Sequence, residues 1–263
     1  MRASNAVREL LWPLLFTLAV AYMAWYTPKF IIAFGGAADA LKLRFAVAGP
    51  MDFAIAALAV VSLVLGVMTI RPAPQEGSNV GVFDRLSLFL GRVTMLLIVG
   101  LVSVMFYEVM LRYVFESPTL WANELSLWIA GLIFLLAGLY SMQQRAHIRI
   151  FLLYDMMPRA VQRVCDSVSV LLIWMFTFAM IWGGYTEAYD KFMRWETFGT
   201  AFDPPIPATL KPLVLFVITL VAIQALLNLI NDWSKAAEVH AVVDESEIEE
   251  FVQEMGAKLT DKV

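Results

Sequence analysis

Long runs without a charged residue are the feature that most limits how this chain can fold. They cover residues 10–28, 53–70, 125–144, 167–186 and 212–231. Each run is close to the ~20 residues that a helix needs to cross a bilayer. Since lipid offers a backbone amide no hydrogen-bond partner, each run is expected to be helical throughout. With 60% hydrophobic and only 16% charged residues, the chain is predicted to be all-α, a polytopic helical membrane protein.

A sixth apolar run, 93–107, is too short to span a bilayer by itself. It becomes long enough if it extends back through 86–91 and Arg92 snorkels toward the headgroups. The sequence therefore predicts about six spans.

The composition excludes several classes of site. Cys165 is the single cysteine, so neither an intramolecular disulfide nor a CxxC motif is possible. His147 and His240 are the only histidines and lie too far apart in sequence to indicate a metal cluster. The pI near 5.3 argues against nucleic acid as a partner. We expect no cofactor, no metal and no catalytic residue.

The start of the chain has features of a secretory signal. Arg2 and Arg8 precede an apolar stretch, and Ala19-Val20-Ala21 resembles a cleavage site. The apolar run continues toward Phe34, longer than a usual signal core, so an uncleaved helix is expected. The topology downstream is the same in either case.

Four regions follow from these patterns. Residues 1–70 form an N-terminal transmembrane hairpin, and 71–82, rich in Pro and Gly, form a linker. Residues 83–232 hold four spans, and 233–263 form an acidic tail. Ser246 and Glu249 make a capping box before an amphipathic helix in this tail.

Basic residues indicate the orientation. If the N-terminus is cytoplasmic, 12 of the 19 Lys and Arg residues lie on the cytoplasmic side. This bias places both termini in the cytoplasm of a bacterial inner membrane, with the strongest basic loop directly after residue 144. Trp121 and Trp195 would then lie in the outer aromatic belt, in contact with membrane lipid.

Polar residues gather at the ends of the spans rather than within them. Glu108 and Arg112 have the spacing and order of an ion pair on one helix face. Ser117-Pro118 is typical of a helix start, with Ser as N-cap, and Asn123 and Glu124 follow it. These residues could pair locally and anchor a re-entering helix, contact a neighbouring subunit, or bind an ion.

For two further loops the sequence also allows two interpretations, an anchor at the membrane surface or a contact with a partner subunit. On the inner side, Arg145, His147 and Arg149 form a positive-inside anchor or a contact with acidic groups of a partner. On the outer side, Trp195 and Glu196 are interface residues or belt residues.

Three stretches in this order resemble the small permease subunit (DctQ type) of tripartite ATP-independent periplasmic (TRAP) transporters. They are "RYVFESPTLWANEL", "QQRAHIRI" with a proline after "LLYDMM", and "WETFGTAFDPPIPATLKP". The resemblance covers about residues 83–232. Two features depart from the family pattern: Phe151 stands where the family often has Asp, and the hairpin of residues 1–70 is additional.

The resemblance implies a four-helix core that braces a large permease subunit (DctM type). That partner would carry the substrate and sodium sites, and a periplasmic substrate-binding protein would deliver an organic acid. The residues that match family motif positions would serve packing and subunit contact: Arg112, Trp121, Glu124, Arg145, His147 and Arg149.

Two other functions remain open from the residues alone. An oligomer of this chain could act alone as a channel or transporter, which would require polar residues along a pore. The chain could instead anchor an enzyme complex in the membrane, which would favour paired histidines inside the spans.

Overall fold

The computed structural model describes residues 2–35, 39–73, 76, 81–145, 154 and 157–234. The predicted amphipathic helix of the tail lies outside the described residues. The regular elements among the described residues are all helices: α1 (Arg2–Ala33), α2 (Asp39–Arg44), α3 (Pro50–Thr69), α4 (Val82–Tyr113), α5 (Ala122–Gln143), α7 (Arg159–Arg194) and α8 (Ile206–Asp232). All except α2 are long and apolar enough to cross a membrane, which gives six candidate spans. The prediction of an all-α polytopic membrane protein is confirmed.

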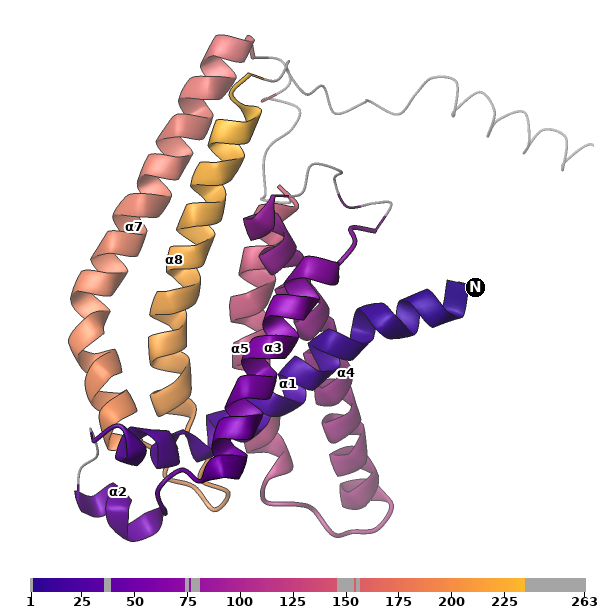
Figure 1. Ribbon diagram of the computed structural model, residues 1–263, viewed down its shortest axis with the longest axis vertical. Helices are drawn as coiled ribbons and strands as arrows, with labels where there is room; N and C mark the ends of the chain where they lie inside the picture. The colour runs from indigo at the N-terminus through magenta and orange to yellow at the C-terminus, as the bar shows by residue number, and fades with distance from the viewer. Residues whose placement is uncertain are drawn as a thin grey trace, which may run out of the picture.

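The long helices form a bundle in which α3, α4, α5, α7 and α8 alternate in direction and α1 runs obliquely across them (Figure 1). The most extensive contacts are those of α7 with α8, α4 with α5, and α1 with α3. Contacts between α5 and α8 join the pair α4–α5 to the pair α7–α8. Helix α4 also contacts both α1 and α3. The turns at 114–121 and 195–205 lie together at one end, which the topology predicted above makes the outer end.

The N-terminal hairpin packs on α4 through a close helix approach. Gly66 of α3 lies against the ring of Phe89, and a Cβ on Gly66 would fall 2.1 Å from a ring carbon. Phe89 and Leu88 are fully buried, and Trp12 and Phe16 of α1 pack on the same cluster. Glycine is therefore required where α3 meets α4.

Helix α4 is continuous through Arg92, as the sixth span requires, but the reason differs from the predicted one. The Arg92 guanidinium donates to Glu76 Oε2 at 2.8 Å, and its side chain is only 16% exposed. Glu76 also accepts from Tyr140 of α5 at 2.8 Å. Arg92 thus meets a counter-ion from the linker instead of snorkelling to the headgroups, which corrects that expectation.

Candidate functional site

Glu108 is the centre of the outer polar cluster. Its side chain is 2% exposed, and both carboxylate oxygens accept hydrogen bonds. Arg112 Nη2 donates to one oxygen at 2.6 Å, which confirms the predicted ion pair. The backbone N–H and the hydroxyl of Thr119 donate to the other at 3.1 and 2.5 Å. Because protein donors satisfy this carboxylate, the geometry favours local anchoring of the turn over a bound ion.

The start of α5 differs from the prediction. Ser117-Pro118 is not helical, and α5 begins at Ala122 after the cap residue Trp121. Thr119 Oγ1 accepts from the Ala122 N–H at 3.3 Å while it donates to Glu108. The bond to Glu108 holds the chain extended past the proline, so the helix starts later than the Ser-Pro pattern indicates.

Glu124 and Trp121 connect α5 to the outer loop before α8. The Thr200 hydroxyl donates to Glu124 Oε2 at 2.5 Å. The Trp121 ring lies between Tyr107 and Phe202, with ring centroids 6.1 and 6.5 Å away. Asn123 is exposed at the same end. The residues predicted for the outer polar cluster therefore lie together around the turn between α4 and α5.

Trp195 is not a belt residue. Its side chain is buried, and it packs with Ile31, Leu41 and Ala208. Its backbone ends α7 in the left-handed region, with φ at 49°. This corrects the placement of Trp195 in the lipid-facing belt, because the outer end of the N-terminal hairpin covers its ring. Glu196 is exposed and pairs with Lys191 at 2.5 Å.

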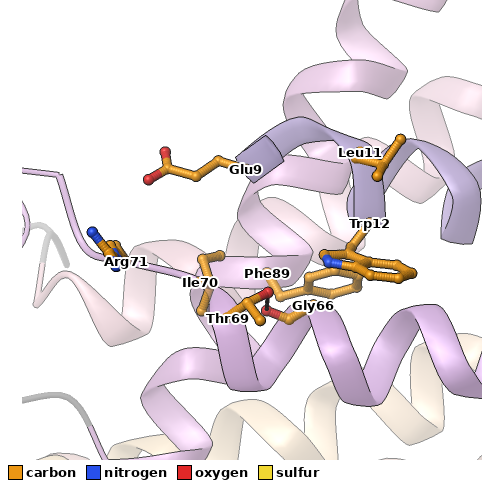
Figure 2. Close-up of a pocket in the computed structure, with 8 residues that line it drawn as sticks. All are labelled: Glu9, Leu11, Trp12, Gly66, Thr69, Ile70, Arg71 and Phe89. Carbon is orange, nitrogen blue, oxygen red and sulfur yellow. Dashed lines mark hydrogen bonds between the residues drawn. The ribbon is translucent and has the colours of Figure 1, made fainter. Parts of the chain in front are cut away.

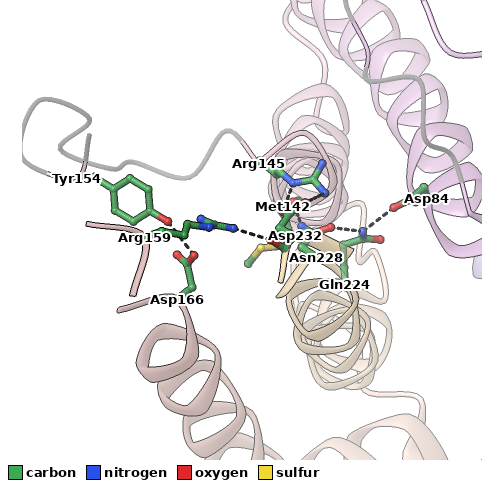
Figure 3. Close-up of polar contacts among 9 residues, drawn as sticks. All are labelled: Asp84, Met142, Arg145, Tyr154, Arg159, Asp166, Gln224, Asn228 and Asp232. Atoms are coloured by element: carbon green, nitrogen blue, oxygen red, sulfur yellow. Dashed lines mark hydrogen bonds and ion pairs between the residues drawn. The ribbon is translucent and has the colours of Figure 1, made fainter. Parts of the chain in front are cut away.

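At the inner end, Arg145 joins α5 to α8 (Figure 3). Its Nε and Nη2 donate to the two oxygens of Asp232 at 2.6 and 2.8 Å. Arg159 at the start of α7 donates to the Asp232 carbonyl at 2.5 Å. Arg145 thus contacts an acid of its own chain. His147 and Arg149, the other residues predicted for this loop, lie outside the described residues, as does Phe151.

Gln224 is a buried polar residue that the sequence reasoning missed. It is fully buried on α8, and its amide donates to Asp84 Oδ1 at 2.7 Å and to Asn228 Oδ1 at 3.0 Å (Figure 3). Ser87 donates to Gln224 Oε1 at 3.1 Å, and Asn228 donates to the Met142 carbonyl at 2.7 Å. These bonds connect α8 to α4 and α5. Two amides one helical turn apart in an apolar span were the available signal.

Asp52 makes a similar connection within the N-terminal hairpin. It accepts from Lys29 at 3.0 Å and from Tyr22 at 2.8 Å, both on α1. Its second oxygen accepts from the Gly49 N–H at 2.8 Å. Within the part of the chain that the structure describes, no group of His, Cys, Asp and Glu could hold a metal ion.

These features define a multi-pass helical membrane protein whose polar side chains join its own helices. Residues 101–234 match the family model described as "Tripartite ATP-independent periplasmic transporters, DctQ component". The match covers half of the chain, from the middle of α4 past the end of α8, and the chain belongs to this family. The resemblance found in the sequence is thereby confirmed, and the family is one of transporter subunits. No curated protein and no solved structure matches the chain.

Proposed function

We propose that this chain is the small subunit of a sodium-coupled TRAP-type secondary transporter and scaffolds a large permease subunit of the DctM type. A periplasmic binding protein would deliver an organic acid, and the substrate and sodium sites would lie in the large subunit. The complex would reside in a bacterial inner membrane, with both termini of this chain in the cytoplasm. Membership of the DctQ family supports this proposal.

The observation that carries the scaffold role is the exposed face of α7. In the most apolar 18-residue stretch of α7, only 6% of the residues are buried. This is the smallest share among the six candidate spans in the described residues. α7 packs mainly on α8. Large apolar side chains at alternating spacings of four and three residues remain exposed on it: Val164, Val168, Leu171, Met175, Phe178, Trp182, Tyr185 and Tyr189. This 3.5-residue repeat is the spacing of helix–helix packing.

The groove among α1, α4, α5 and α8 is unsuited to carrying an organic anion. A groove of about 730 Å³ lies among α1, α4, α5 and α8, and apolar side chains dominate its lining. The hydroxyls of Thr17, Thr27 and Thr209 in this lining donate to backbone carbonyls of their own helices. A carboxylate would lose its hydration here without gaining a cationic partner. This favours a supporting role over transport by an oligomer of this chain.

The test is reconstitution. The purified chain alone in proteoliposomes should take up no organic acid under a sodium gradient. Addition of the large permease subunit and the binding protein should start uptake, and the two membrane subunits should co-purify in mild detergent. Sodium-driven uptake by the chain alone would overturn the proposal, and so would a homo-oligomer that excludes the large subunit.

A further inference from the structure

A second hollow, of about 370 Å³, lies where α1 begins and α3 ends (Figure 2). Trp12 of α1 and Phe89 of α4 supply aromatic walls, and Ile70 and Leu11 add apolar surface. Thr69 and Gly66 of α3 also line it. The hollow is therefore apolar in its depth, and its volume suits a small headgroup with the first carbons of a chain.

The mouth of this hollow carries one charge of each sign. Glu9 and Arg71 line it, and both are exposed. In Figure 2 the two side chains extend to the same side of the pocket. Among the described residues, neither forms a salt bridge within 4.0 Å, with the other or with a third group. By contrast, Asp52, Glu76 and Glu108 each have a cationic partner.

The positions of Glu9 and Arg71 along the chain indicate their depth in the membrane. Glu9 is the first residue of the first candidate span, and Arg71 follows the last residue of α3 by two positions. Trp12, whose ring is amphipathic, lies one helical turn from Glu9. Because both charges lie at span ends, we expect the hollow where the hydrocarbon meets the headgroups.

We propose that this hollow binds a zwitterionic aminophospholipid. The Arg71 guanidinium holds the lipid phosphate, because guanidinium donors match phosphate oxygens in a two-pronged geometry. The Glu9 carboxylate accepts hydrogen bonds from the primary ammonium. The upper part of one acyl chain lies across Trp12 and Leu11. This binding is independent of the transport role proposed above and requires only that the chain spans a membrane.

The pair of charges distinguishes this lipid from the alternatives. An anionic phosphoglycerol headgroup would satisfy Arg71 but place its charge beside Glu9 without an ammonium to balance it. A quaternary choline carries a positive charge but has no N–H to donate to Glu9. Free inorganic phosphate would engage Arg71 without contacting the apolar walls.

The experiment measures lipid binding to the full chain in a neutral maltoside detergent by native mass spectrometry. The probes are dioctanoyl phosphatidylethanolamine, phosphatidylcholine and phosphatidylglycerol, with inorganic phosphate as a fourth. We expect the ethanolamine lipid to bind about tenfold more tightly than the other two lipids, the effect of one charge-assisted contact of about 1.4 kcal/mol. Inorganic phosphate should not compete with it.

Two variants and a control assign the contacts. Glu9→Gln should abolish the preference for ethanolamine over choline, and Arg71→Gln should weaken all three lipids. Arg85→Gln removes another exposed inner arginine that does not line the hollow and should leave the order unchanged. Equal or tighter binding of phosphatidylglycerol by the unaltered chain, or an unchanged ethanolamine preference in Glu9→Gln, would overturn the proposal.

Discussion

The Arg145 guanidinium holds both carboxylate oxygens of Asp232, at 2.6 and 2.8 Å. It so ties the turn directly after α5 to the last residue of α8. This two-pronged geometry is the strongest form of an Arg–carboxylate pair. Both side chains are partly buried, 34% and 24% exposed. The type and position of Arg145 suggest an anchor to lipid or a contact with a partner. In the structure it instead joins two helices of its own bundle.

Replacement of Arg145 should therefore weaken the chain by itself. We expect Arg145→Ala to lower the free energy of unfolding by about 1 kcal/mol, since the pair is only partly shielded from solvent. Thermal unfolding of the isolated chain in detergent measures this change. The exchange Arg145→Asp with Asp232→Arg should recover part of the loss. Equal stability of Arg145→Ala and the unaltered chain would show that the pair contributes nothing.

The spans were predictable because lipid imposes one rule on every residue of a run, and each run without charge lies almost entirely within one helix. The helix ends were less predictable, since α7 extends eight residues beyond its run, 167–186, at each end. Contacts between distant segments were not predictable in the same way. Trp195 resembles a belt residue by its position, yet the first hairpin buries it. Arg92 resembles a snorkelling residue, yet Glu76 of the linker meets it. In both cases the deciding partner belongs to another segment of the chain, 16 positions away for Arg92 and more than 150 for Trp195. No local sequence pattern indicates such a partner.

Gln224 is expected to stabilise the bundle through its buried hydrogen bonds. Gln224→Leu would keep the volume but leave Asp84 and Ser87 without their partner on α8. An unsatisfied buried polar group costs about 1–3 kcal/mol, and a loss of this size should appear in chemical unfolding of the isolated chain. Asn228→Ala, which leaves the bonds to Asp84 and Ser87 in place, should cost less. The reverse order would mean that the contact to Met142 dominates.

Glu108 and Arg112 should respond unequally to replacement, although they form one ion pair. Glu108 is buried and also holds Thr119, whereas the Arg112 side chain is 42% exposed. Glu108→Ala should lower the melting temperature about twice as far as Arg112→Ala, because it removes more hydrogen bonds. Thr119→Val should reproduce part of the Glu108 effect. An equal loss from both ion-pair variants would show that the pair alone anchors the turn.

Because Gly66 of α3 lies directly against Phe89 of α4, we expect that adding one methyl group at Gly66 would push the two helices apart. Gly66→Ala would place a Cβ 2.1 Å from a ring carbon of Phe89 and should destabilise the chain by about 1–3 kcal/mol. Gly100→Ala is the matched control, because a Cβ there meets no atom within 4 Å. Phe89→Leu combined with Gly66→Ala should cost less than the two single losses together. Strict additivity would place the origin of the effect elsewhere.

If the proposed function holds, the large permease subunit binds the exposed ridge of α7, which is the row of apolar side chains from Val164 to Tyr189. Trp182 is 81% exposed and stacks on Phe178 of the same helix. Trp182→Ala should therefore leave the melting temperature of the isolated chain unchanged but lower the amount of large subunit that co-purifies with it. Phe134→Ala on α5 is the matched control, because that ring is 79% exposed and lies off the ridge. Exposed aromatic residues that face only lipid would make the two variants equal. A loss confined to Trp182→Ala would indicate that the large subunit contacts α7, because co-purification measures binding between the two subunits.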